Sequence, residues 1–462
     1  MSAPTVRPGE PGPNSAGDAF RPSPDPGTAD PWLRRNFILL TLDGAFFSAG
    51  AAFYDPGTVL AVFASTLTRS KFLIGLAASA RTVGWYLPQL FVASLTEHLR
   101  FKGRLVIVNS LSHRVLLLLM ALVTHLYAGS RPGLALGLFL PILLISAVSE
   151  GINGVPWTDA VANTIPAERR GRLFANQQII GGLAAFANGL AVRAILDRVP
   201  YPDAYVVLFL CTFVFFTGSI GSFMGVKERP APEVRPKRRP LGGYLRALPE
   251  IWRNDPSFAR VTLVRFCGLG FIYLSMPFFV LHARQNLGAD LGAVGVYVSA
   301  QMLGSLAGSA LAGRLSDTVG ARPAVLLAVA AALSAPASAL GLTLCKVLGW
   351  AAVARAGFPA VYFFAGAAFG AGYIGFTNYV LEAAPAVERP TYIGLSNTLM
   401  APFGFLSAVG GVLAAAAGYE AVFAASAIAG LAGVALSLGL PEPRRAAGER
   451  LRSVLDGSLP AE

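Results

Sequence analysis

Residues 75–97 read GLAASARTVGWYLPQLFVASLTE, and residues 295–317 read GVYVSAQMLGSLAGSALAGRLSD. At a constant offset of 220 residues the two segments share Gly75 with Gly295, Ser79 with Ser299, Ala80 with Ala300, Gly84 with Gly304 and Leu95 with Leu315. The same offset places Glu97 on Asp317 and, farther along, Glu168 and Arg169 on Glu388 and Arg389. Identities that keep one offset over this length and include charged loop positions are not explained by chance, so the chain is built from two related halves.

The composition places both halves in a membrane. Of the 462 residues 54% are hydrophobic and only 13% are charged, and the mean hydropathy is +0.57. A span needs about 20 mostly apolar residues, because only a helix satisfies its own backbone hydrogen bonds in hydrocarbon. The 50 glycines suit such helices, since small residues let neighbouring backbones approach closely. We therefore expect lipids around most of the chain.

The apolar runs predict an all-α membrane protein with twelve transmembrane helices. The expected spans are 36–63, 73–95, 105–127, 133–158, 173–196, 203–225, 259–283, 291–314, 324–345, 357–383, 392–417 and 419–440. Six spans return the chain to its starting side, so the halves have the same orientation. They should form two pseudo-symmetric six-helix bundles about an axis along the membrane normal, with any solute site near the midplane between them.

Loops and tails complete the predicted domain organisation. We expect a disordered cytoplasmic tail at 1–31, a first bundle at 32–226, a cytoplasmic linker at 227–256, a second bundle at 257–441 and a cytoplasmic tail at 442–462. Lys and Arg concentrate in the loops on the side of both tails, as in Arg100, Lys102 and Arg104. This asymmetry predicts that both termini are cytoplasmic.

The loop after span 291–314 carries a recognisable motif. Residues 313–322 read GRLSDTVGAR, which resembles the G-x-x-x-D-x-x-G-x-[RK] loop of the major facilitator superfamily in Gly313, Asp317, Gly320 and Arg322. The equivalent loop at 93–102, ASLTEHLRFK, keeps the acid Glu97 and the final base but lacks both glycines. A carboxylate here can lie near a helix N-terminus and pair with arginine. We predict a conformational latch in these loops, completed by Glu382 or Arg389 at the end of span 357–383.

The resemblance covers about residues 36 to 440 and implies alternating access by rocking of the two halves. It also implies that the first, fourth, seventh and tenth spans line the cavity. Residues 43–47, DGAFF, and 84–89, GWYLPQ, are similar to a bacterial branch of the superfamily. Drug/proton antiporters of the superfamily carry a Gly-Pro element in the fifth span. Span 173–196 has no such proline, which disfavours drug efflux.

Ionisable residues inside spans are costly unless they are paired or reach water, so each marks a candidate site. Asp43 and Glu150 lie on expected cavity spans, where a carboxylate can exchange a proton as solute binds, and we predict one of them as the proton-coupling site. Asp55 and Arg81 lie at matching depth on consecutive spans and form either a buried ion pair or a gate or substrate contact. Arg265 either binds an anionic group or pairs with Asp43.

Arg81 and Arg265 join a set of substrate-cavity candidates whose other members are aromatic and amide side chains: Phe47, Asn153, Tyr273, Tyr373 and Asn378. The three cysteines are not paired in a CxxC motif, and the sequence has no metal-spaced His/Cys cluster, nucleophile motif or Walker sequence. These patterns predict no cofactor, no metal, no ATP and no enzymatic activity. Basic residues occur in short loop clusters, which argues against a nucleic-acid partner.

These features predict a secondary active transporter of a small solute in the cytoplasmic (inner) membrane, driven by an ion gradient for which protons are the leading candidate. A second hypothesis is a transporter-like sensor or scaffold that binds a solute without moving it. A membrane-embedded enzyme acting on lipid would need a catalytic constellation that the sequence does not contain. The solute, the direction of transport, the coupling ion and the oligomeric state stay open at this stage.

Overall fold

A computed structural model describes residues 32–96, 99, 101–228, 249, 251–384 and 389–443. All regular structure in these ranges is helical. The part before residue 229 consists of α1 (Leu33–Ala51), η1 (Ala52–Tyr54), α2 (Val59–Leu67), α3 (Lys71–Tyr86), α4 (Gln89–Thr96), α5 (Gly103–Tyr127), α6 (Pro132–Thr164), α7 (Ala167–Arg198) and α8 (Asp203–Met224).

The part after residue 250 is also entirely helical in its regular structure. It consists of α10 (Pro256–Arg265), η2 (Phe266–Gly270), α11 (Ile272–Gln285), α12 (Ala293–Thr318), α13 (Ala321–Val347), α14 (Ala351–Gly357), α15 (Pro359–Ala383), α16 (Arg389–Thr398), η3 (Ala401–Phe405) and α17 (Leu406–Leu438).

Ten stretches of the described ranges are long and apolar enough to cross a membrane. One of them, Leu395–Leu438, holds two spans, because α17 changes direction at Gly418, where φ is +87°. A further span is formed by α3 and α4, which Leu87 and Pro88 separate. The predicted twelve-helix all-α membrane fold is therefore confirmed.

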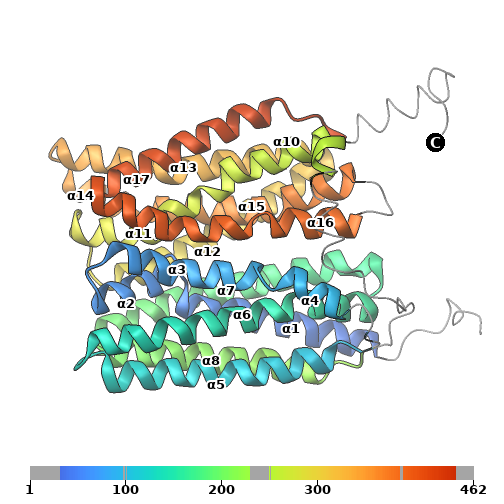
Figure 1. Ribbon diagram of the computed structural model, residues 1–462, viewed down its shortest axis with the longest axis horizontal. Coiled ribbons are helices and arrows are strands. Elements are labelled where there is room, and N and C mark those ends of the chain that lie inside the picture. Colours follow the sequence, from blue (N-terminus) through green and yellow to red (C-terminus); the bar gives the residue numbers. More distant parts are fainter. Residues whose placement is uncertain are drawn as a thin grey trace, which may run out of the picture.

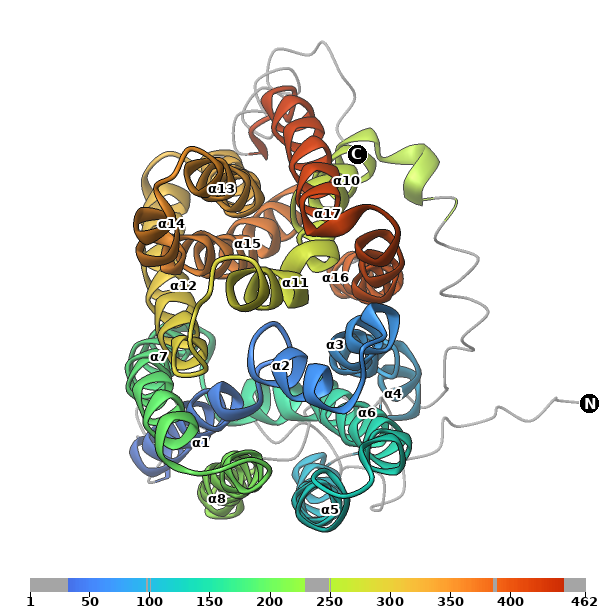
Figure 2. The ribbon, with the colours of Figure 1, turned by 90° about the vertical axis from the view of Figure 1, so that its left-hand side faces the viewer.

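The helices form two bundles that lie side by side. Figure 1 shows α1 to α8 in one layer and α10 to α17 in the other, with their long axes nearly parallel. In the end-on view of Figure 2 the bundles meet where α7 lies beside α12 and α3 lies beside α17, and these helix pairs are in contact. We call them the first bundle and the second bundle.

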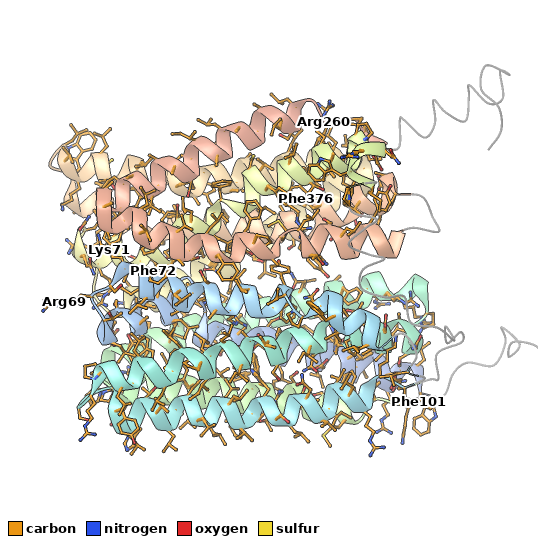
Figure 3. The ribbon with its side chains drawn as sticks, viewed as in Figure 1. Arg69, Lys71, Phe72, Phe101, Arg260 and Phe376 are labelled. Carbon is orange, nitrogen blue, oxygen red and sulfur yellow. The ribbon has the colours of Figure 1, made fainter. Side chains whose placement is uncertain are left out.

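The two ends of the molecule differ. Both ends of the described chain, at Trp32 and Pro443, lie at the end that carries α10, and we call this the termini end (Figure 1). The far end carries α14 and the turn between α2 and α3. Figure 3 shows Arg69 and Lys71 at the far end, with Phe101 and Arg260 at the termini end.

Both bundles use the same device at the termini end. The Glu228 carboxylate accepts hydrogen bonds from the backbone N–H groups of Lys102 and Gly103 at 2.9 Å each, at the start of α5. Glu442 accepts from the N–H groups of Ala321 and Arg322 at 3.2 and 3.1 Å, at the start of α13. A carboxylate stabilises the partial positive charge of a helix N-terminus. The chain that leaves each bundle is thereby tied to that bundle's third span.

The predicted tail 1–31, most of the predicted linker 227–256 and nearly all of the predicted tail 442–462 lie outside the described residues. The domain boundaries that depend on them stay predictions.

Candidate functional site

A cavity of about 240 Å³ lies between the two bundles, and we call it the central cavity. The break between η1 and α2 at Pro56 and the part of α11 around Pro277, a proline inside the helix, both contribute to its wall. Its lining comprises Asp55, Pro56, Gly57, Ala78, Arg81, Thr82, Trp85, Tyr86 and Glu150 of the first bundle, and Tyr273, Met276, Pro277, Gln301, Phe369 and Ser407 of the second.

A second cavity, of about 300 Å³, lies within the first bundle, and we call it the bundle cavity. Its polar lining includes Asp43, Ser110, His113, Arg114, Glu150, Asn153, Gln177, Gln178 and Ser219, and its aromatic lining is Phe47, Trp85, Trp157, Phe216 and Phe223. Trp85 and Glu150 line both cavities. Glu150 therefore occupies the boundary between the solute-sized space at the bundle interface and the interior of the first bundle.

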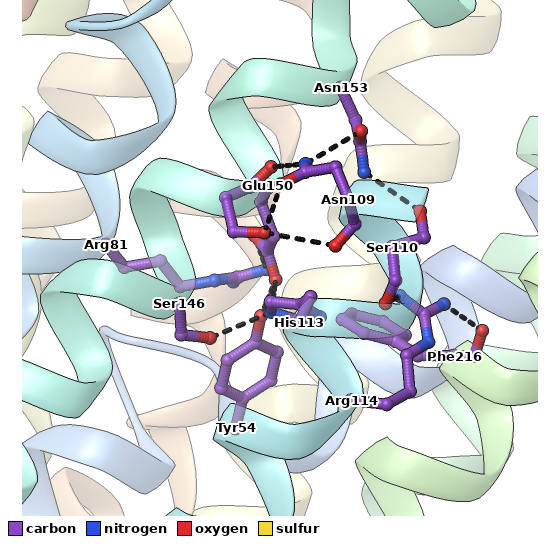
Figure 4. Close-up of polar contacts among 11 residues, drawn as sticks. Tyr54, Arg81, Asn109, Ser110, His113, Arg114, Ser146, Glu150, Asn153 and Phe216 are labelled. Carbon is purple, nitrogen blue, oxygen red and sulfur yellow. Dashed lines mark hydrogen bonds and ion pairs between the residues drawn. The ribbon is translucent and has the colours of Figure 1, made fainter. Parts of the chain in front are cut away.

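Glu150 lies near the middle of α6 and is only 5% exposed. Figure 4 shows three side chains that converge on its carboxylate. The Tyr54 hydroxyl donates a hydrogen bond to it, Arg81 Nη2 lies 3.5 Å from Oε2, and His113 Nε2 lies 3.5 Å from Oε1. The Arg81 guanidinium also lies over the Tyr54 ring, 4.2 Å from its centroid. Three helical segments besides α6 thus contribute to the surroundings of one buried acid.

An amide ladder ties α5 to α6 beside this acid. Asn109 Nδ2 donates to Asn153 Oδ1 at 2.9 Å, and Asn153 Nδ2 donates to Ser110 Oγ at 2.9 Å (Figure 4). Ser146 Oγ lies 2.8 Å from His113 Nε2. Asn153, predicted to line the substrate cavity, lines the bundle cavity and makes an interhelical contact, which places α5 and α6 in register around Glu150.

Asp43, the other predicted proton site, lies on α1 and faces the bundle cavity. Trp157 Nε1 donates to one of its oxygens at 2.7 Å, and Ser219 Oγ donates to the other at 2.6 Å. Both donors belong to the first bundle. Asp43 is therefore held within one bundle and does not line the space between the two.

The predicted ion pair between Asp55 and Arg81 is not formed, since Arg81 pairs with Glu150 instead. Asp55 follows η1, where Pro56 interrupts the first span. Its Oδ1 accepts hydrogen bonds from the Gly57 N–H at 3.0 Å and from the Thr58 hydroxyl at 2.9 Å. The break leaves backbone donors without helical partners, and the carboxylate takes them up. Both residues do line the central cavity, as the alternative prediction of a substrate contact requires.

Arg265 does not pair with Asp43. Its Nη1 donates to Ser396 Oγ at 2.6 Å and lies 3.5 Å from Asn397 Oδ1, so it links α10 to α16 within the second bundle. It lines neither cavity. The same holds for Asn378, which donates to Ser316 Oγ at 2.9 Å.

The aromatic candidates are divided between the two cavities and the surface. Tyr273 lines the central cavity, and Phe47 lines the bundle cavity, where it stacks on Phe216 at a centroid distance of 4.9 Å. Tyr373 is 62% exposed and lies outside both cavities.

The predicted latch is only partly within the described residues. Glu97 and the side chain of Arg389 lie outside them. Asp317 is exposed and makes no hydrogen bond or ion pair with the residues that the structure describes, and Glu382 is half-buried.

The other residues of the loop motif have different surroundings. Arg322 donates to the Leu438 carbonyl at 2.7 Å, and a Cβ atom on Gly320 would meet Glu442, whereas one on Gly313 would have nothing within 4 Å. The latch stays a prediction.

Tyr54 and His113 are functional candidates that sequence reasoning missed. His113 carries a usable signal, because an ionisable side chain inside an apolar span marks a site by default. Tyr54 carries none, since a tyrosine in a span is most often packing. Only the break after η1 directs its hydroxyl to Glu150.

Comparison with known proteins gives a consistent result. The family model described as Major Facilitator Superfamily matches residues 42–407 and 261–456. No curated protein matches the sequence. The fold is similar to that of the xylose transporter XylE from E. coli in a partially occluded inward-open conformation, with 13% identity, a TM-score of 0.64, and coverage of 89% of this chain and 100% of that chain.

Two further structures have the same fold. A D-xylose-proton symporter gives 14% identity and a TM-score of 0.65, covering 89% of this chain and 99% of that one. A bacterial homologue of the human lysosomal transporter Spinster, inward-facing and unoccupied, gives 13% identity and a TM-score of 0.60, covering 89% and 95%. At these identities the likeness concerns the fold alone, and the predicted bacterial branch stays a prediction. The family match over most of the chain shows that this multi-pass membrane protein belongs to the Major Facilitator Superfamily.

Proposed function

We propose that the protein is a proton-coupled secondary transporter of a small solute, with the central cavity as the solute site and Glu150 as the proton site. The observation that carries the proposal is the position of Glu150, which is buried, lines both cavities and contacts Arg81. A carboxylate in that position can exchange a proton and release or hold the arginine beside the solute. Asp43, with two donors inside one bundle, is the weaker candidate.

Packing between the bundles supports alternating access. A Cβ atom on Gly75 would lie 2.0 Å from the Ser407 carbonyl oxygen, and one on Gly295 would lie 2.3 Å from the Gly189 carbonyl oxygen. Lys71 Nζ donates to the Ala414 carbonyl at 2.7 Å. These close approaches join α3 to α17 and α7 to α12 in their far-end halves, which favours a conformation closed at the far end. Rocking the bundles about the central cavity would open that end.

The loop charges support a location in the cytoplasmic membrane with the termini end inside. Arg169, Arg170 and Arg172 at the start of α7 add to the cluster before α5 at the termini end. On this orientation the far end, where these close approaches lie, faces away from the cytoplasm.

The proposal is tested with purified protein in sealed proteoliposomes that contain a pH-sensitive dye. Sugars, amino acids, organic acids and lipophilic cations are added in turn, and proton movement driven by each solute is recorded. We expect one class to move protons with the wild type. Glu150→Gln should reduce this signal to that of protein-free vesicles yet still exchange labelled solute across the membrane, because exchange needs no net proton transfer.

Asp43→Asn is the matched control, since it also neutralises a buried carboxylate of the first bundle. It should retain both solute-driven proton movement and exchange. If Glu150→Gln still moved protons with the solute as the wild type does, Glu150 would not be the proton site. Saturable binding without any flux, in wild-type protein, would favour the sensor or scaffold hypothesis.

A further inference from the structure

Three arginines on described spans, the buried Arg114 and the half-buried Arg81 and Arg265, differ in how their guanidinium groups are satisfied. Arg114 donates to the backbone carbonyls of Ser110, at 2.9 Å, and Phe216. Arg265 donates to Ser396 Oγ at 2.6 Å and reaches the Ser396 carbonyl at 3.3 Å. Each of these two guanidinium groups donates to neutral carbonyl or hydroxyl oxygens of neighbouring helical segments.

Arg81 is different. Its one hydrogen bond among the described residues is the 3.5 Å contact with Glu150, and, like Arg114 and Arg265, it has a buried Nε without a partner. A guanidinium group carries five N–H donors, and a buried donor without a partner costs free energy. Arg81 lies on the wall of the central cavity, with its charge supported by the Tyr54 ring at 4.2 Å. It is therefore a cation with unused donors beside a solute-sized space.

Gln301, on the second bundle, has a hydrogen-bond acceptor without a partner. The residue is 7% exposed and lines the central cavity, and its Nε2 donates to Asp55 Oδ2 at 3.2 Å across the bundle interface. Its Oε1 is buried and has no partner. The cavity lining thus combines a cation with unused donors on the first bundle, an acceptor without a partner on the second bundle, and the apolar side chains of Met276 and Phe369.

We infer that the transported solute is a small organic monocarboxylate whose chain also bears a hydrogen-bond donor. The carboxylate binds the Arg81 guanidinium, the donor binds Gln301 Oε1, and the carbon chain packs on Met276 and Phe369. The donor can be a hydroxyl, as in a hydroxy acid, or an ammonium group, as in an amino acid. This inference rests on the proposed function, because it names the solute class of the same cavity.

The charges of the site explain why such a solute would move with a proton. Arg81 contacts one carboxylate, that of Glu150, and Asp55 is already satisfied by Gly57 and Thr58. When Glu150 takes a proton, Arg81 loses the one carboxylate that it contacts, and the solute carboxylate replaces it. Proton and anion then favour each other's binding at one arginine. The hydroxyl oxygens of a neutral sugar can accept hydrogen bonds from Arg81 but would leave its charge without an anionic partner.

A matched set of six-carbon probes tests the inference on full-length protein in detergent: hexanoate, 2-hydroxyhexanoate, norleucine and 1,2-hexanediol. Ligand binding raises Tm by mass action, and we expect 2-hydroxyhexanoate or norleucine to raise it by about 2 °C or more. Hexanoate should give a smaller rise and 1,2-hexanediol none. A response to 2-hydroxyhexanoate alone would assign the donor as hydroxyl, and a response to norleucine alone would assign it as ammonium.

Variants connect the response to the two side chains. Arg81→Gln should abolish the rise for every carboxylate, whereas Gln301→Leu should make hexanoate and its substituted forms equivalent. Glu150→Gln should keep or enlarge the rise, because it removes the competing anion. Arg355→Gln, an exposed arginine on α14, is the control and should respond like the wild type. Each variant is compared only if its ligand-free Tm is within a few degrees of the wild type, and Arg81→Lys serves where Arg81→Gln does not fold.

The outcomes separate this inference from the proposed function. A rise with 1,2-hexanediol equal to that with the acids, a rise that persists in Arg81→Gln and Arg81→Lys, or no rise with any carboxylate would overturn the inference. Proton-coupled flux of a neutral sugar in proteoliposomes would overturn it as well and leave the transporter proposal standing. Arg81-dependent binding of a carboxylate with no flux would overturn the transporter proposal and leave the assignment of the ligand class standing.

Discussion

At Gly320 the residue type is determined by a segment more than a hundred positions away in the chain. The backbone of Gly320 has φ = +130°, a region that residues with a side chain rarely adopt, and a Cβ atom there would lie 2.4 Å from the carboxylate of Glu442. That carboxylate follows α17, which packs against α13, and it caps the start of α13. Glycine is therefore needed both for the conformation and for the space.

Gly320→Ala should lower stability by on the order of 1–3 kcal/mol, because it combines backbone strain with displacement of the Glu442 cap. Gly313→Ala, in the same loop motif but with nothing within 4 Å of the added atom, should have little effect. Thermal unfolding in detergent measures both. Equal losses for the two substitutions would show that the close contact with Glu442 is unimportant.

At the scale of elements, several spans are interrupted, and the interruptions create the site. The first span breaks at Asp55 and Pro56, the second at Pro88, and the seventh contains the π-helical turn η2. In lipid such breaks persist only where side chains or other helices satisfy the freed backbone groups. The break after η1 places Asp55 on the cavity wall and Tyr54 against Glu150.

Asp55 should therefore matter to stability as a capping group and not through its charge. Asp55→Ala removes the acceptor for Gly57 and Thr58 and should cost about 0.5–2 kcal/mol. Asp55→Asn keeps a side-chain oxygen for the same donors and should cost clearly less. Thermal unfolding without solute distinguishes them. A loss for Asp55→Asn as large as for Asp55→Ala would mean that the negative charge, and not the cap, stabilises the break.

At the scale of the molecule, the bundles are held together at the far end by backbone approaches that only glycine permits. Gly75 meets the backbone of α17, and Gly295 meets the backbone of α7. Close packing of this kind gains dispersion energy without hydrophobic driving force, as is usual between helices in lipid. Such contacts are easily separated as rigid surfaces, which suits a molecule whose halves rock.

Gly75→Ala should therefore shift the population toward a conformation open at the far end, because the added methyl group would lie 2.0 Å from a backbone oxygen that cannot move alone. Gly137→Ala, on α6 with nothing within 4 Å, is the matched control. Spin labels at Arg69 and Val353, on far-end parts of the two bundles, report the change by double electron–electron resonance. The labels need a background in which Cys211, Cys267 and Cys345 are replaced by serine.

We expect a longer-distance population in Gly75→Ala and the wild-type distribution in Gly137→Ala. Identical distributions in all three proteins would argue against closure of the far end by this contact.

Membrane class, span number and the two-fold repeat could be predicted from the sequence, because a span is a local property of about 20 apolar residues and a repeat is a comparison of the chain with itself. Glu150, Arg81 and Tyr273 could also be selected, since ionisable and aromatic residues stand out within apolar runs. The residues that each of these side chains contacts could not be predicted. Sequence shows the depth of a residue along its helix but not the direction in which its side chain points once the helix is broken.

Arg81 lies at a depth that suits Asp55 equally well, yet it contacts Glu150, because Pro56 turns the Asp55 carboxylate toward freed backbone donors. The Glu228 and Glu442 caps likewise join residues more than a hundred positions apart, and no local pattern announces them. The amino-acid order thus specifies what must be buried in the membrane. Which charges meet there depends on how the helices break and pack, since a buried charge takes the nearest donor that the assembled bundles present.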